Sequence, residues 1–145
     1  MIERELDQLL DELRIEYRKS PIEEGVNYEI KPRPDIDLRL DLDLCGDTLN
    51  VNFNGCFGML EQAEFMPKLG QNPKAFDEWR TYCLSYVRDI LTSDLRIETR
   101  WLLGHLLGGY LYRRAGSKWE CYGGGGSVFM FLGKHTLREY RSWRD

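Results

Sequence analysis

The sequence predicts an α+β domain, mainly antiparallel sheet with helices packed on one face. Three observations lead to this class. Two segments have the helical spacing of apolar residues, one long segment alternates apolar and polar residues, and glycine-containing turns join the strand-like runs. Tight turns imply antiparallel pairing. The predicted order is α-β-β-β-α-β-β-β-β-α, in a single domain over residues 1–145, a length typical of one domain.

The first element is predicted to be a helix that begins near Ile2. Apolar residues return every three or four positions with acidic residues between them, at Ile2, Leu6, Leu9, Leu10, Leu13 and Tyr17. Ser20 and Pro21 are expected to end the helix, because the residue before a proline avoids the α conformation. A short or edge strand is predicted next at Val26–Ile30, since prolines follow it closely.

The clearest local pattern is the alternation from Ile36 to Leu44, which predicts a strand with apolar and charged faces. Gly46 and Asp47 then offer a two-residue hairpin turn. The resulting register places Leu44 opposite Leu49, Leu42 opposite Val51, Leu40 opposite Phe53, Asp43 opposite Asn50 and Asp41 opposite Asn52. A slip of one residue would bury the aspartates, so we expect this register to be firm.

The middle of the chain is predicted to be a connection followed by a long helix. Residues 55–71 mix glycine and proline with apolar residues, which is typical of a packed-down connection or a functional loop. Asn72 and Pro73 suit an N-cap and a first helical turn. A broad apolar stripe from Phe76 to Leu91 predicts the central helix of the core.

A second sheet region is predicted after this helix. Turns at Gly104-His105 and Ala115-Gly116 would pair Trp101 with Gly108, Thr99 with Tyr110, Ile97 with Tyr112, Tyr112 with Trp119 and Tyr110 with Cys121. Gly123–Gly126 is predicted to be a flexible hairpin loop, and Ser127–Leu132 a short strand. The tail is predicted to be a helix, because Thr136 and Glu139 have the spacing of a capping box.

Charge is distributed unevenly along the chain. Residues 1–70 carry 8 Lys and Arg against 16 Asp and Glu, whereas residues 71–145 carry 12 against 8. Two halves that neutralise each other explain this asymmetry. A dipolar surface that offers its acidic side to a basic partner explains it as well.

The remaining composition favours a reducing compartment. The start of the chain lacks the features of a signal peptide, and no run of about 18 apolar residues occurs. The 4 cysteines form no CxxC pair, which argues against structural zinc. We therefore predict a cytoplasmic protein with free thiols, no cofactor, no metal and no membrane among its partners.

One candidate binding surface is the polar face of the predicted hairpin. It is expected to carry Asp37, Asp41, Asp43, Asn50 and Asn52. Such a face could bind a basic protein partner, and the structural alternative is a solvated sheet surface. Calcium is disfavoured, because the carboxylates lie on strands without the loop spacing of an EF-hand.

An alternative site is a pocket near the aromatic face of the second sheet, formed by Glu98, Arg100, His105 and Tyr110. Glu98, Arg100 and Glu120 could be neighbours on adjacent strands and hold a substrate, but cross-strand charge pairing is the usual explanation of such a cluster. The glycine run could cradle a phosphate, but it leads into a strand-like segment rather than a helix. No residue set has the order of a catalytic triad.

The sequence therefore favours a protein-binding module over an enzyme. A small acidic chain with a carboxylate-bearing hairpin could antagonise or escort a basic partner protein, an analogy of class that rests on no shared motif. The alternatives are a small enzyme or small-molecule binder, and a subunit that forms oligomers through a sheet edge. Nucleic acid is an unlikely partner, because the sequence pI is about 5.3.

Overall fold

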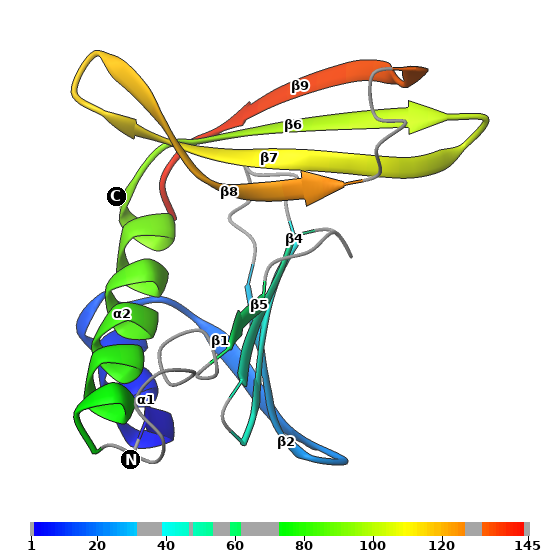
Figure 1. Cartoon of the computed structure of the whole chain (residues 1–145). Helices are drawn as coiled ribbons and strands as arrows, with labels where there is room; N and C mark the ends of the chain where they lie inside the picture. Colours follow the sequence, from blue (N-terminus) through cyan, green and yellow to red (C-terminus); the bar gives the residue numbers. More distant parts are fainter. Residues whose placement is uncertain are drawn as a thin grey trace. The chain divides into compact units, whose positions relative to one another are not determined.

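The computed structural model describes residues 2–31, 39–46, 48–53, 59–61, 73–126 and 132–143. These residues form two helices and nine strands, which confirms the α+β class with antiparallel sheets. The strands form two sheets (Figure 1). The chain divides into two compact units, one up to Arg88 and one from Asp89 to Trp143, so the boundary falls within the second helix.

The first unit holds a five-stranded sheet in which each strand pairs with the next along the chain. The strands are β1 (Tyr17–Ile22), β2 (Gly25–Ile30), β3 (Leu40–Cys45), β4 (Thr48–Phe53) and β5 (Met59–Glu61). The predicted register of the β3–β4 hairpin is confirmed at all five positions, from Leu44↔Leu49 to Asp41↔Asn52. Gly46 has the positive φ, 57°, that a tight hairpin turn requires.

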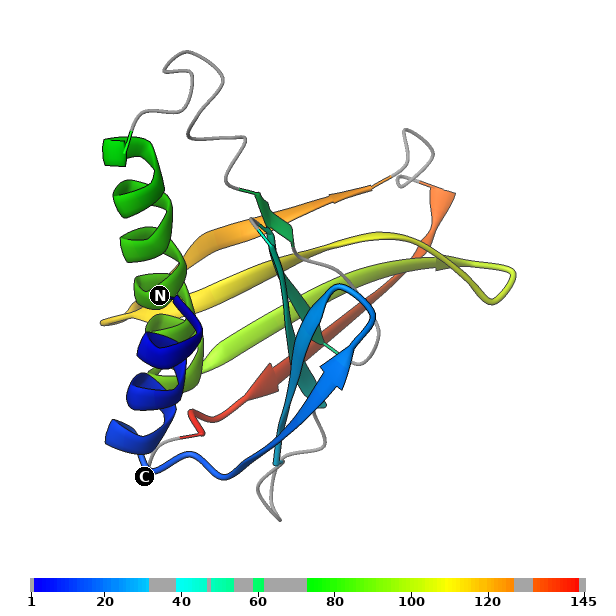
Figure 2. The same cartoon turned by 90° about the horizontal axis from the view of Figure 1, so that it is seen from below.

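Two helices, α1 (Ile2–Glu12) and α2 (Pro73–Thr92), accompany this sheet. Figure 1 and Figure 2 show both on the same side of it. The core of the unit combines apolar residues of α1, α2 and the sheet; its largest fully buried side chains are Trp79, Tyr28, Leu6, Leu10, Ile30, Leu40, Leu42 and Leu49. Ion pairs between Arg80 and Glu5 and between Arg88 and Glu12 join the two helices.

The predicted first helix is too long. It ends at Glu12, and Arg14 then takes the left-handed conformation with φ of 57°. The apolar spacing continues to Tyr17 only by coincidence, because Tyr17 begins β1 and pairs with Ile30. Pro21 lies in β1, which is an edge strand where a missing backbone donor is tolerated. The short β5 was also missed, within the segment predicted as a connection.

The second unit holds a four-stranded antiparallel sheet in the order β8-β7-β6-β9. Its strands are β6 (Leu95–Leu102), β7 (His105–Ala115), β8 (Lys118–Gly126) and β9 (Lys134–Tyr140). Both predicted turns are displaced by one residue, because Leu102 pairs with His105 and Ala115 pairs with Lys118. Thr99 therefore lies opposite Gly109 and not opposite Tyr110.

The predicted C-terminal helix is wrong, since Lys134–Tyr140 forms β9 and pairs with β6 from Leu95 to Trp101. Pairing with a neighbouring strand satisfies the backbone, and this tertiary effect outweighs a local capping pattern. Gly123–Gly126 is not a loop but the last part of β8. Of the strand predicted at Ser127–Leu132, residues 127–131 lie outside the described residues. No helix in the described ranges is long and apolar enough to cross a membrane.

Candidate functional site

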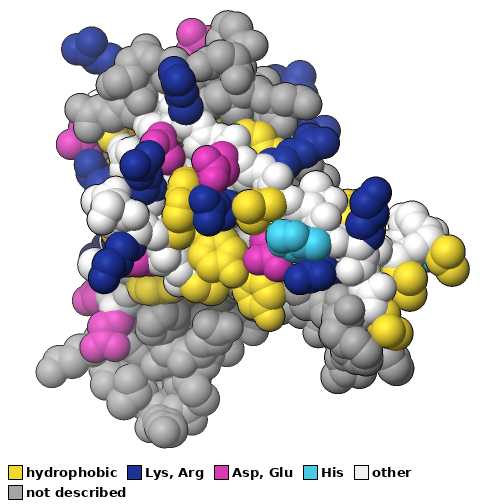
Figure 3. Space-filling view, turned by 90° about the horizontal axis from the view of Figure 1, so that it is seen from above, with side chains coloured by type: hydrophobic (Ala, Val, Ile, Leu, Met, Phe, Trp, Pro, Cys, Tyr) yellow, Lys and Arg dark blue, Asp and Glu magenta, His cyan; other side chains and the backbone are white. Residues whose placement is uncertain are grey.

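The second sheet has one buried face and one open face. Side chains alternate along each strand, and Leu95, Ile97 and Leu111 are buried on one side. Figure 3 looks onto the molecule from above, where basic, acidic and hydrophobic side chains lie next to one another. The residues opposite the buried side are half-buried or exposed. We call them the open face: Arg96, Glu98, Arg100, Tyr110, Tyr112, Trp119, Cys121, His135, Leu137 and Glu139.

Strand pairing explains why these residues meet. Glu98 lies opposite Tyr110 on β7 and opposite Leu137 on β9. Two residues further along β6, Arg100 lies opposite His135. Directly opposed residues in an antiparallel pair share a face, so an acid, a base, an imidazole and a phenol are brought together. A register shift follows Arg100, and this cluster lies on the regular side of it.

The carboxylate of Glu98 is the centre of the cluster. Its Oε1 lies 3.2 Å from His135 Nε2 and 3.6 Å from Arg100 Nη2. Its Oε2 accepts a hydrogen bond of 3.4 Å from the hydroxyl of Tyr112. The Glu98 side chain keeps 19% of its surface exposed, whereas that of His135 keeps 43%. The hydrogen bond from Tyr112 and the close approach of His135 and Arg100 hold the Glu98 side chain in place while leaving the cluster within reach of a partner.

The two tyrosines of the open face form an aromatic pair. The rings of Tyr110 and Tyr112 are 6.4 Å apart and tilted by 45°. Burial raises the pKa of the Tyr112 hydroxyl, and the nearby Glu98 carboxylate raises it further. Tyr112 is therefore a neutral donor at physiological pH, and Glu98 is a suitable acceptor for it.

Arg96 joins an aromatic ring to an acidic side chain. Its guanidinium lies 4.4 Å from the ring centre of Trp119, a cation–π distance. It also forms an ion pair of 2.6 Å with Glu139 on β9. These contacts cross the sheet from β8 to β9 and form a second cluster on the open face, beside the one around Glu98.

The structure brings together three of the four residues predicted for the alternative site. Glu98, Arg100 and Tyr110 share the open face, but His105 begins β7 opposite Leu102 and is exposed at the hairpin end. His135 occupies the place expected for the histidine. His135 was not predicted as a site residue, because the tail was predicted to be a helix. The alternation of Lys134–Tyr140 also fits a strand.

The first predicted surface is also assembled, on the other sheet. Asp41 and Asp43 of β3 lie opposite Asn52 and Asn50 of β4, and all four side chains are half-buried. Asp37 lies outside the described residues. The sequence-based pairing of polar with polar residues is therefore confirmed for these four, whereas their role in binding stays a prediction.

The carboxylates of this hairpin have donors of their own. Asp43 accepts hydrogen bonds from the amides of Asn27 at 2.6 Å and Asn52 at 3.2 Å. Oδ2 of Asp41 pairs with Arg39 at 2.8 Å, whereas its Oδ1 is buried without a hydrogen-bond partner. These donors neutralise or satisfy much of the charge that an approaching basic partner would meet.

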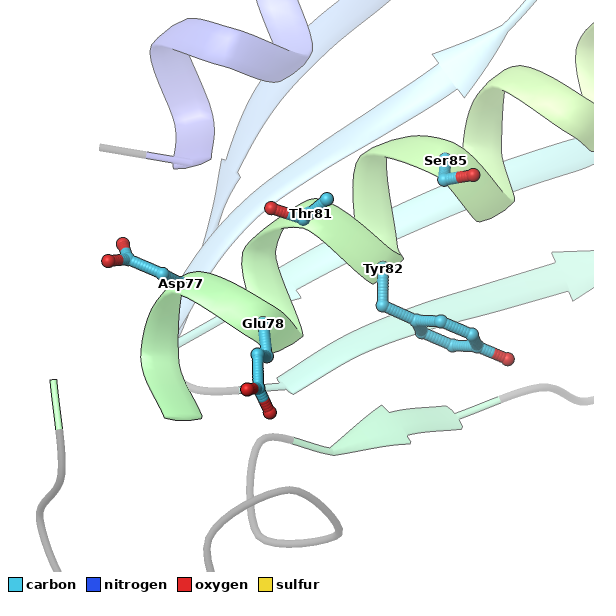
Figure 4. Close-up of a pocket in the computed structure, with 5 residues that line it drawn as sticks. All are labelled: Asp77, Glu78, Thr81, Tyr82 and Ser85. Atoms are coloured by element: carbon cyan, nitrogen blue, oxygen red, sulfur yellow. The ribbon is translucent and has the colours of Figure 1, made fainter. Parts of the chain in front are cut away.

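A groove of about 520 Å³ runs along α2. Figure 4 shows the side chains that line it from the helix, namely Asp77, Glu78, Thr81, Tyr82 and Ser85. Tyr82 is 44% exposed, and its ring lies 6.2 Å from that of Tyr86. Asp77 pairs with Arg80 one turn further on. Among the described residues, none of those predicted for a site from the sequence lines this groove.

Neither a metal site among the described residues nor a similar protein indicates what reaction or ligand the chain has. Within the described ranges, no group of three or more His, Cys, Asp or Glu side chains could hold a metal ion. Comparisons with family models, with curated proteins and with solved structures found no match. The proposed function therefore rests on the chemistry of the open face and of the hairpin face.

Proposed function

We propose that the chain is a protein-binding module and that the open face of the second sheet is its contact surface. The observation that supports this most strongly is the composition of a sheet face whose residues are all at least partly exposed. Two tyrosines, a tryptophan and two arginines lie on it, in two contact clusters around Glu98 and Arg96. Tyrosine, tryptophan and arginine are the residues enriched at protein interfaces and among their energetic hot spots.

A macromolecular partner suits this surface better than a small molecule. Small-molecule sites are concave and enclose most of their ligand. The groove described above lies on α2 of the first unit and not on this face. A sheet face with partly exposed polar and aromatic groups matches the composition of an ordinary protein interface.

A protein also suits the surface better than nucleic acid. The face carries two carboxylates, Glu98 and Glu139, beside its arginines, whereas a nucleic-acid surface is usually strongly basic. Single-stranded nucleic acid usually stacks its bases on exposed aromatic rings. The Trp119 ring is already covered by Arg96 at 4.4 Å.

The acidic hairpin face of Asp41 and Asp43 is the second candidate surface, for a basic partner protein. A lysine or arginine of the partner would compete there with Asn27, Asn52 and Arg39 for the same oxygens. This competition lowers the gain from binding, so we place the hairpin face behind the open face.

The experiment that tests the proposal maps the contact surface directly. A photo-crosslinking residue is introduced at Leu137 of the open face or at Asn50 of the hairpin face, and the captured protein is identified and purified. We expect a specific adduct from position 137. Affinity of the purified partner is then measured for Leu137→Arg and Asn50→Arg, and only Leu137→Arg should weaken binding by about tenfold or more.

Two other outcomes of the crosslinking experiment would change the conclusion. An adduct and an affinity loss confined to position 50 would transfer the function to the hairpin face. If neither position yields an adduct, the protein-binding proposal is rejected. The urea unfolding midpoints of both variants must equal that of the wild type, because both replaced side chains are at least partly exposed.

A further inference from the structure

The exposed apolar residues of the chain are concentrated at one end of the second sheet. Eight large hydrophobic side chains among the described residues are exposed, and five of them lie at the β6–β7 hairpin or directly before β9: Trp101, Leu102, Leu103, Leu106 and Leu132. Figure 3 shows hydrophobic side chains at the end of the molecule where Figure 1 places this hairpin. We call these five residues the apolar tip. Clustered exposure of this kind marks interaction sites.

Leu103 occupies a position that does not suit leucine. It is 91% exposed, and its φ is 50°, in the left-handed region. Gly104 follows with φ of 80°, so that the two residues have the positive φ pair of a type I′ turn. Asparagine followed by glycine is the usual choice there. A leucine at this place costs free energy through backbone strain and through exposure, and such an outlier points to a function.

The tip is apolar on both faces of the hairpin. Trp101 and Leu102 are consecutive in β6, so their side chains point to opposite sides of the sheet, and Leu106 lies opposite Trp101. A protein surface that contacted one side of the hairpin would leave the other side in water. An environment that surrounds the hairpin end, such as the interfacial layer of a bilayer, covers both sides, and tryptophan is enriched at that depth.

Basic residues surround the apolar tip. Lys134 lies opposite Trp101, His105 lies opposite Leu102, and Arg100 precedes Trp101. The sequence contains no Asp or Glu in residues 99–119 or in residues 121–138. The nearest carboxylate on these strands is that of Glu98, which is already shared by Arg100 and His135. A surface with this charge attracts anionic headgroups.

We propose that the apolar tip docks on an anionic lipid surface, with Leu103 inserted deepest and Lys134, His105 and Arg100 at headgroup level. The turn at Leu103 and Gly104 closes the hairpin end with few unpaired backbone groups, which limits the cost of entering the interface. The sequence-based prediction of no membrane partner rested on the lack of a spanning segment, which docking by the tip does not need. The proposal does not rest on protein binding by the open face, although Arg100 belongs to both surfaces.

The test uses the full chain and vesicles of phosphatidylcholine, either pure or mixed with phosphatidylglycerol. We expect flotation of the wild type with the anionic vesicles, less with the neutral ones, and a decrease with added salt. Leu103→Asn should reduce partitioning by roughly tenfold or more. The same variant should unfold at an equal or higher urea concentration, because asparagine suits the turn. This pairing of weaker binding with an undamaged fold excludes misfolding as the cause.

Two matched variants complete the experiment. Ile22→Asn changes an exposed apolar residue of β1 in the first sheet, and it should leave partitioning unchanged. Lys134→Gln should weaken binding to anionic vesicles only. The proposal is overturned if the wild type does not float with anionic vesicles, or if Leu103→Asn floats as well as the wild type. Leu103-dependent self-association without lipid binding would overturn it in favour of a second copy of the chain.

Discussion

The hydroxyl of Tyr28, on the sheet of the first unit, donates a hydrogen bond of 2.9 Å to the carboxylate of Asp7 on α1. Tyr28 is fully buried, so its hydroxyl needs a partner. Lys19 of β1 contacts the same carboxylate at 2.9 Å and that of Glu3 at 2.8 Å. Its ammonium also lies 5.2 Å from the Tyr28 ring centre. Four side chains thus connect the helix to two strands.

Tyr28→Phe should destabilise the protein by about 1–2 kcal/mol, because it removes a hydrogen bond to a charged acceptor and keeps the ring. Asp7 remains partly solvated and paired with Lys19, so the loss should not be larger. Urea unfolding followed by circular dichroism measures the difference. A midpoint equal to that of the wild type would show that water replaces the hydroxyl at no cost.

The same cluster predicts loss of stability at alkaline pH. Burial and the Asp7 hydrogen bond raise the pKa of the Tyr28 phenol, and Glu3 and Asp7 raise the pKa of Lys19. For both groups the protonated form is favoured in the folded state. Their stabilisation is therefore complete below the unfolded pKa values of about 10 and is lost as pH rises through the folded values. Unfolding midpoints measured between about pH 8 and pH 11 should fall, and they should fall less in Tyr28→Phe.

Gly25→Ala and Gly46→Ala should differ sharply. A Cβ at Gly25 would lie 1.9 Å from the backbone oxygen of Leu44, so β2 and β3 would have to separate, at a cost of roughly 3 kcal/mol or more. A Cβ at Gly46 would meet no atom within 4 Å, and only its φ of 57° opposes the change, at about 1 kcal/mol. Thermal or urea unfolding of the two variants compares the free-energy cost of the steric clash at Gly25 with that of the backbone strain at Gly46. Equal losses would contradict the close approach of the two strands.

The thiols should react in a defined order. Cys83 is buried in α2, and burial raises its pKa to about 12, whereas Cys121 on the open face is exposed. Alkylation at about pH 8 should therefore modify Cys121 quickly and Cys83 only after unfolding, since the thiolate is the reactive form. Peptide mapping after timed quenching identifies the modified positions. Rapid labelling of native Cys83 would show that the core opens locally.

The β3–β4 hairpin shows where sequence reasoning succeeds. Leucine alternates with aspartate along β3, and Gly46 follows at the end. Turn chemistry and alternation specify the same register independently, and any slip would bury a carboxylate. In the second sheet the sequence specified the register of the strands less strongly. Polar and apolar residues occur on both faces there, so a displacement of one residue had little visible cost, and the predicted turns were each displaced by one position.

The residues of the candidate site meet through strand pairing, which local sequence patterns do not specify. Glu98, Arg100 and Tyr110 were assigned to one candidate site from the sequence, but the histidine of the cluster, His135, was not. Thr136 and Glu139 have helix-capping spacing, and Lys134–Tyr140 has strand alternation, so that the local signals conflict. Pairing with β6 resolved the conflict and placed His135 3.2 Å from Glu98.

The α+β class, the two amphipathic helices and the hairpin register could be predicted from the sequence, because each of these follows from periodicity and turn chemistry within a short segment. The tertiary structure was needed to show that the strands form two sheets, that the tail is a strand, and which residues share the open face. These features depend on contacts between segments far apart in the chain, such as β6 with β9. Their free energy comes from backbone pairing and burial that no local pattern encodes.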